Sequence, residues 1–195
     1  MSGGSQPHPE SLYYHIAGDS LASAENETDR FRKMQYIATS LVFSALCLEI
    51  FINDAFHQQA MTNSALTDFE RLPLKEKWLL LPLISGASKT FDIGSEPFQT
   101  FSALIKLRNN RLVHFKPRDE IDTGEKPLKK RNLNEIFCDM GLAKKHYENI
   151  AMMIAELNRL TNGKTALPGF LTGSKYIASV WKTLTLLSSS ENEPT

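Results

Sequence analysis

Two residues six positions apart, Arg108 and His114, are of types that could act together on a phosphate group in this 195-residue chain. They lie in the stretch RNNRLVHF, near the end of FQTFSALIKLRNNRLVHFKP. The planar guanidinium of arginine binds phosphate oxygens through two parallel hydrogen bonds and stays charged. Histidine titrates near neutrality and passes protons. With a ribose 2′-hydroxyl as internal nucleophile, such a pair is sufficient for RNA cleavage without a metal.

The segment that carries both residues has the pattern of an amphipathic α-helix. On a helical wheel with about 100° per residue, Arg108 falls inside an apolar stripe, and His114 lies about 120° away from Arg108. On one straight helix the two side chains therefore do not meet. Either the long arginine side chain reaches across, or two copies of the helix form the site at the twofold axis of a homodimer. The stripe consists of Phe98, Phe101, Leu104, Ile105, Leu112 and Phe115.

An arginine in an apolar stripe needs a partner, because a lone buried charge costs several kcal/mol. Glu49 and Asn53 lie four residues apart in another apolar segment, so they share a helix face. The simplest prediction is that Glu49 pairs with Arg108, and that Asn53 and Asn109 complete the hydrogen bonds. The same pair could be purely structural, with His114 at the surface.

The hydrophobic pattern elsewhere predicts an all-α fold, an up-and-down bundle of four to five helices. From Asp29 to Phe56 apolar residues recur every three or four positions on nearly all faces, which indicates a central helix. No segment shows the alternation of a strand. Further helices are expected over residues 11–24, 73–84, 97–115 and 132–161, the last one broken near Gly141.

The chain is long enough for one domain with its own core. We expect residues 1–28 to be a flexible segment with room for a short helix. Residues 29–163 are expected to form the bundle, and residues 164–195 a short helix followed by a disordered tail.

Charge and cysteine content point to a cytoplasmic protein. The net charge is zero, but residues 106–131 hold nine basic and four acidic side chains, a local +5. Cys47 and Cys138 lie in apolar-patterned segments and are expected to be buried thiols in a reducing compartment. The most apolar run contains Glu49 and Asp54, which favours a core helix over a membrane span.

No other group of residues has the spacing of a metal, cofactor or nucleophile site, so no metal and no cofactor is expected. His57 follows Asn53 by four residues and could join its helix face, although a surface position is the simpler expectation. His146 is expected to be solvated.

The motif RNNRLVH resembles the signature of the HEPN superfamily, which is an arginine followed by four to six residues and a histidine at the end of a helix. Five residues separate the pair here, and the polar residue after the arginine, Asn109, is part of the pattern. The stretches LEIFIND, EKWLLLPL and PFQTFSALIKLRNNRLVHFKP are similar to bacterial HEPN-like proteins. The resemblance covers roughly residues 30–160.

The resemblance implies a helical bundle that dimerises through the motif helices and cleaves RNA without a metal, often in toxin–antitoxin or defence systems. Arg108 would hold the scissile phosphate, His114 would be the general acid or base, and Asn109 would orient the arginine or the substrate. A protein antitoxin on another chain would then be a further partner. Neighbours expected to contact the substrate are Asn110, Arg111 and Lys116, with Glu49 and Asn53 in support.

Some members of the superfamily are non-catalytic, so a dimerisation module or a nucleotide- or RNA-binding module is the alternative. The two hypotheses make different structural predictions. An enzyme would place Arg108 and His114 in an open cleft at a dimer twofold axis. A module would have Arg108 taken up by Glu49.

Overall fold

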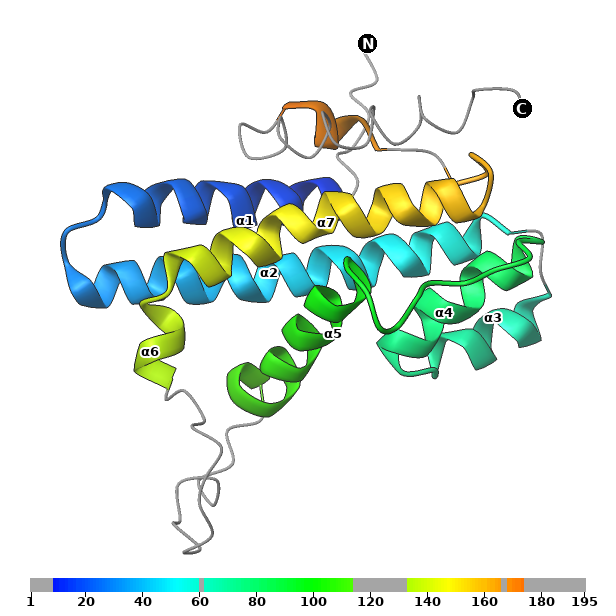
Figure 1. The fold of residues 1–195 in the computed structure, drawn as a ribbon, viewed down its shortest axis with the longest axis horizontal. Coiled ribbons are helices and arrows are strands. Elements are labelled where there is room, and N and C mark those ends of the chain that lie inside the picture. Colours follow the sequence, from blue (N-terminus) through cyan, green and yellow to red (C-terminus); the bar gives the residue numbers. More distant parts are fainter. Residues whose placement is uncertain (1–8, 60–61, 114–132, 166–167, 174–195) are drawn as a thin grey trace, which may run out of the picture.

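The computed structural model describes residues 9–59, 62–113, 133–165 and 168–173 (Figure 1). These residues form seven α-helices, one π-helix and one 3₁₀-helix, and they contain no strand. The predicted all-α class is confirmed.

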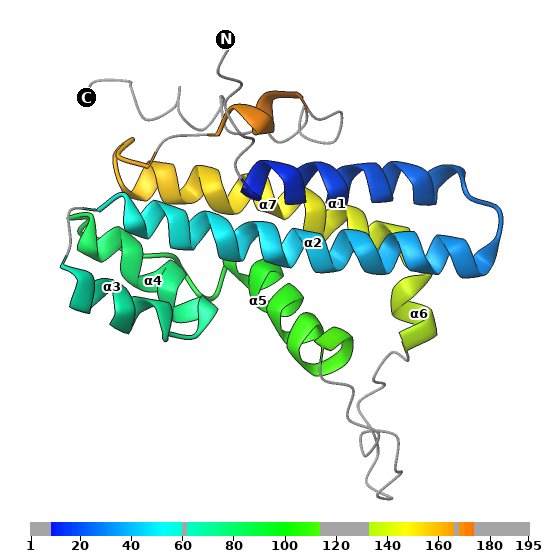
Figure 2. The same ribbon diagram turned by 180° about the vertical axis from the view of Figure 1, so that it is seen from behind.

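Three long helices form the main layer: α1 (Pro9–Asn26), α2 (Arg30–His57) and α7 (Met140–Leu160). α1 and α2 make an antiparallel hairpin, and α7 packs against both of them (Figures 1 and 2). One face of α1 is fully buried. Its residues recur every three or four positions: Tyr14, Ala17, Leu21 and Ala24. Pro9–Asn26 is therefore a helix packed within the bundle, whereas the sequence predicted a short helix over 11–24 in a flexible segment outside the bundle. The reason is that its apolar residues cover the face of α2 that would otherwise be exposed.

The central helix α2 begins after Asp29, whose side chain accepts a hydrogen bond from the Arg32 backbone N–H at 2.8 Å. This is an N-cap, which satisfies one of the free donors at a helix start. α2 is also the one helix of the described residues that is long and apolar enough to cross a membrane. Half of that apolar window is buried inside the bundle, as in the core helix of a folded domain.

Shorter helices cover the C-terminal half of α2 on the side away from α1 (Figures 1 and 2). They are α3 (Asn63–Glu70) and α4 (Leu74–Ile84), with Pro73 just before α4 as its sequence predicts. Trp78 of α4 is fully buried and lies between Phe91 and Phe101. This aromatic group fixes α4 against the helix that follows it.

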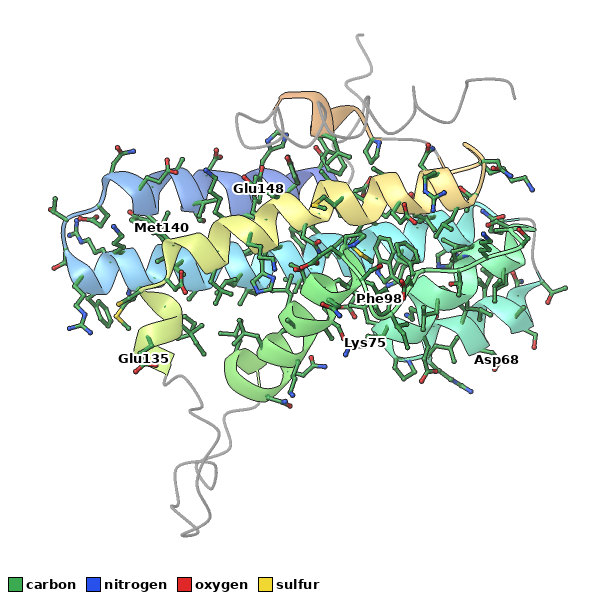
Figure 3. All side chains as sticks on the ribbon, viewed as in Figure 1. Asp68, Lys75, Phe98, Glu135, Met140 and Glu148 are labelled. Atoms are coloured by element: carbon green, nitrogen blue, oxygen red, sulfur yellow. The ribbon has the colours of Figure 1, made fainter. Side chains whose placement is uncertain are left out.

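That next helix, α5 (Phe98–Leu107), is shorter than predicted, because the chain continues as a π-helix, η1 (Arg108–Val113). The sequence predicted one α-helix from 97 to 115, so this prediction is wrong for residues 108–113, and residues 114 and 115 lie outside the described part of the chain. The first two residues after Arg108 are asparagines, which are weak helix formers and hold the α-helical hydrogen-bond pattern poorly. The start of α5 at Phe98 lies beside α7, and its end diverges from it (Figure 3).

The expected last helix is two helices, α6 (Leu133–Phe137) and α7. The break falls at Cys138 and Asp139, just before the predicted Gly141. Asp139 caps α7 through a 2.8 Å hydrogen bond from the Leu142 backbone N–H. Past the end of α7, Gly163 has a φ of 77°, the left-handed conformation that commonly terminates helices. A 3₁₀-helix, η3 (Gly169–Gly173), follows.

The cysteines differ from each other. Cys47 is buried in α2, and burial raises the pKa of its thiol. Cys138 is exposed in the break between α6 and α7, so the expectation of two buried thiols is wrong for it.

Candidate functional site

Arg108 lies where α5 ends and the π-helix begins, and it contacts Glu49 in the middle of α2. Its Nη1 atom is 2.8 Å from Glu49 Oε2, and the two side chains are 21% and 32% exposed. The predicted pairing of these two residues is confirmed. π-helical turns are rare and often occur at functional sites. Because Arg108 is the first residue of η1, its contact with Glu49 is a candidate functional site.

The contact between Arg108 and Glu49 is a close approach of charges rather than a well-aligned hydrogen bond. Glu49 Oε2 is shielded from solvent and receives no hydrogen bond with acceptable angles from the described residues, although Nη1 is 2.8 Å away. A bidentate fork would align two N–H groups with the carboxylate. A partly exposed pair of this kind contributes at most about 1 kcal/mol to stability, so little holds the guanidinium to Glu49.

A second cation lies one helical turn further along α2. Lys77 of α4 is only 5% exposed, and its Nζ donates a 2.8 Å hydrogen bond to Asn53 Oδ1. The same Nζ lies 5.5 Å from the ring centroid of Phe69, within range of a cation–π interaction. The prediction that Asn53 supports Arg108 is therefore wrong. Asn53 faces α4, and a buried ammonium requires a hydrogen-bond acceptor.

Burial lowers the pKa of Lys77 below its ordinary value, and the negative charges of Glu49 and Glu70 partly oppose this effect. Glu49 thus acts on two cations, Arg108 through direct contact and Lys77 through the field of its carboxylate. Two basic groups, Arg108 and Lys77, therefore lie along one face of α2 and share the carboxylate of Glu49, while the carboxylate of Glu70 also acts on Lys77.

The next residue at this spacing on α2 is His57, whose Nε2 lies 3.2 Å from Glu70 Oε1 of α3. Both side chains are about half exposed. Glu49, Asn53 and His57 therefore form a polar row on α2, four residues apart, and each meets a different element. The row joins η1, α4 and α3, which all lie on the same side of α2 in Figures 1 and 2.

The other predicted site residues lie outside this buried contact or outside the described residues. Asn109 and Asn110 are exposed in η1, so Asn109 does not complete the buried pair as expected. Arg111 lies within η1. His114 and Lys116 lie outside the described residues. The structure thus brings together Arg108, Glu49, Lys77 and Asn53, and the predicted meeting of Arg108 with His114 stays a prediction.

Two residues of interest escaped the sequence interpretation. Lys77 ends the charged stretch KEK and directly precedes the apolar run that starts at Trp78, so there was little sign in the sequence that its side chain is buried. His146 was expected to be solvated, but it is 3% exposed, and burial lowers its pKa to about 4. It lies three residues after Ala143 and four before Ile150, both buried, so its spacing places it on the core face of α7.

Among residues 9–59, 62–113, 133–165 and 168–173, no group of three or more His, Cys, Asp or Glu side chains is placed to hold a metal ion. No family model, curated protein or solved structure matches the chain.

Proposed function

We propose that this chain is a metal-independent RNA endonuclease of the HEPN type, in which Arg108 holds the scissile phosphate. The observation that carries the proposal is the state of Arg108. Its guanidinium lies at the edge of the bundle, one-fifth exposed, and touches a carboxylate without forming an aligned fork. An arginine in this state is positioned in advance and remains available to a phosphate, which reduces the cost of ordering it during the reaction.

In the proposed reaction His114 removes the proton from a ribose 2′-hydroxyl, whose oxygen then attacks the adjacent phosphorus. The bond from phosphorus to the 5′-oxygen breaks, and the leaving oxygen takes up a proton from a protonated His114 imidazole. The products are a 2′,3′-cyclic phosphate end and a 5′-hydroxyl end. Arg108 stabilises the negative charge that develops on the phosphate oxygens. Asn109 orients the arginine or the substrate, and Asn110, Arg111 and Lys116 bind neighbouring nucleotides.

The proposal includes a cytoplasmic homodimer and a HEPN-like bundle of four to five helices around the motif. Two copies of the segment that begins at Arg108 would bring two arginines and two histidines to one twofold axis.

A second candidate function is a non-catalytic HEPN-like module for dimerisation or for nucleotide or RNA binding. The contact of Arg108 with Glu49 inside a single chain favours it, because a purely structural arginine would be taken up in this way. The incomplete alignment of the contact and the second cation at Lys77 favour the enzyme.

Incubation of the purified chain with a mixed RNA pool in the presence of EDTA tests the proposal. We expect cutting that leaves 2′,3′-cyclic phosphate or 3′-phosphate ends, and no cutting by Arg108→Ala or His114→Ala. Arg159→Ala is a matched control, because Arg159 also pairs with a glutamate at 2.8 Å but on the far part of α7. RNA that is bound but left intact by the folded native protein would support the module.

A further inference from the structure

The arrangement of Arg108, Glu49 and Lys77 creates an electrostatic problem that any phosphate-binding role for Arg108 must solve. To bind a phosphate, the guanidinium has to give up part of its contact with Glu49. That would leave a carboxylate whose Oε2 atom is shielded from solvent without its counter-charge. A partly exposed carboxylate that loses its counter-charge is destabilised by at most the roughly 1 kcal/mol that such a pair contributes. The carboxylate would also repel the arriving phosphate.

Lys77 lies where it can solve this problem. Its Nζ is held by Asn53, which is one turn along α2 from Glu49 and on the same face. The charge of Glu49 already acts on Lys77, because it raises the lysine's pKa against the effect of burial. The flexible four-carbon stem and three rotatable donors of a lysine let the ammonium serve two neighbouring acceptors.

The surroundings of Lys77 keep its side chain near α2. Its Nζ lies 5.5 Å from the centroid of the Phe69 ring. Burial lowers its pKa, and the charges of Glu49 and Glu70 oppose this effect. Because the Lys77 side chain is only 5% exposed, direct contact between it and a bulky RNA chain is unfavourable. A buried basic group whose hydrogen-bond acceptor lies one helical turn from a carboxylate is suited to act on that carboxylate.

We propose that Lys77 is a positioning residue that serves as the counter-charge of Glu49 while Arg108 turns to a phosphate. Glu49 therefore exchanges one cation for the other, holding Arg108 in the free protein and relying on Lys77 in the complex. This inference rests on the proposed function only in that Arg108 binds a phosphate of RNA.

A double-mutant cycle between Lys77 and Glu49 tests the exchange. The probes are a short 2′-O-methyl RNA, which cannot be cleaved through its 2′-oxygen, and inorganic pyrophosphate. In the native background we expect Lys77→Met to weaken Arg108-dependent binding of the RNA about tenfold, within the range of couplings between neighbouring groups. In the Glu49→Gln background the same change is expected to alter binding less than about twofold, because no carboxylate needs a counter-charge.

The controls separate this role from a structural one and from direct contact. Lys75→Met removes a charge from the same helix and is expected to leave binding unchanged (Figure 3). Lys77→Arg keeps the charge and is expected to restore most of the affinity. If Lys77→Met does not fold, Lys77→Gln takes its place in the cycle, because its amide can still donate to Asn53.

Each outcome decides between the two proposals. An equal loss of binding in both backgrounds, or no loss in a folded Lys77 variant, overturns the exchange. Native protein that binds neither probe through Arg108 also overturns it. The expected coupling without any RNA cleavage supports the exchange and rejects the nuclease, whereas cleavage without coupling rejects the exchange alone.

Discussion

Arg108 Nη1 lies 2.8 Å from Glu49 Oε2, and this contact joins the first residue of the π-helix to the middle of the central helix. The two residues are 59 positions apart in the chain, and each stands alone as a charge in an apolar pattern. Their meeting explains why a helix with an apolar face carries an arginine at its end. It also leaves the arginine side chain about one-fifth exposed.

The contact itself is expected to add little stability. In a cycle of Arg108→Gln, Glu49→Gln and the double variant, we predict a coupling of at most about 1 kcal/mol in the free energy of unfolding. Urea denaturation followed by circular dichroism measures it. The pair Arg159 and Glu156 is the matched reference. A coupling of several kcal/mol would mean that Arg108 is a structural charge, which would weigh against a role in binding.

The pairing was predictable from the sequence, because an arginine and a glutamate in apolar stripes must satisfy each other. The acceptor of Lys77 was not predictable, since the pattern of α4 does not say which turn of α2 it packs against. The π-helix was not predictable either. It depends on the hydrogen-bond register after Leu107, and the spacing of apolar residues carries no information about that register.

His146 is expected to make the fold sensitive to acid. Burial lowers its pKa from the ordinary 6.5 to about 4, so the unfolded chain binds a proton more readily than the folded chain. The free energy of unfolding should therefore fall as the pH drops from about 6.5 to about 4, by up to about 3 kcal/mol. Urea denaturation across this range should show a smaller fall in His146→Gln than in the native protein.

The exposed His15 on α1 supplies the control for that measurement. His15→Gln is expected to keep the acid dependence of the native protein. An unchanged dependence in a folded His146→Gln would mean that the histidine is protonated in the native state, contrary to its burial.

Lys77 is expected to act on stability at the other end of the pH range. Its pKa in the folded protein lies below the ordinary 10.5, mainly because of burial. Between the lowered value and 10.5 the unfolded chain binds more protons, so the free energy of unfolding gains a contribution as the pH rises through this interval. Lys77→Met should lack this contribution, and Lys75→Met should retain it. Identical alkaline profiles for all three proteins would contradict a lowered pKa.

Close packing between α1 and α7 makes Gly18 intolerant of a side chain. A Cβ at this position would lie 2.6 Å from Tyr147 Oη, and Tyr147 is buried and stacked on Tyr14 with ring centroids 4.9 Å apart. We predict that Gly18→Ala lowers the free energy of unfolding by about 1–3 kcal/mol, as overpacking usually does. Adding Tyr147→Phe should recover part of the loss.

Thermal denaturation compares these variants with Gly169→Ala, where a Cβ meets no atom within 4 Å. Gly169→Ala is expected to leave the melting temperature nearly unchanged. A Gly18→Ala protein as stable as the native one would show that α1 can move away from α7, and that α1 is less firmly part of the bundle than its buried face indicates.

RNA cleavage in EDTA by the native chain, Arg108→Ala and Arg159→Ala, with folding of each confirmed by circular dichroism, tests directly whether Arg108 holds the scissile phosphate. We expect 2′,3′-cyclic phosphate ends from the native chain and from Arg159→Ala, and their loss in Arg108→Ala. Equal cleavage by all three folded proteins, or none by the native chain, would contradict the assignment of Arg108 to the scissile phosphate.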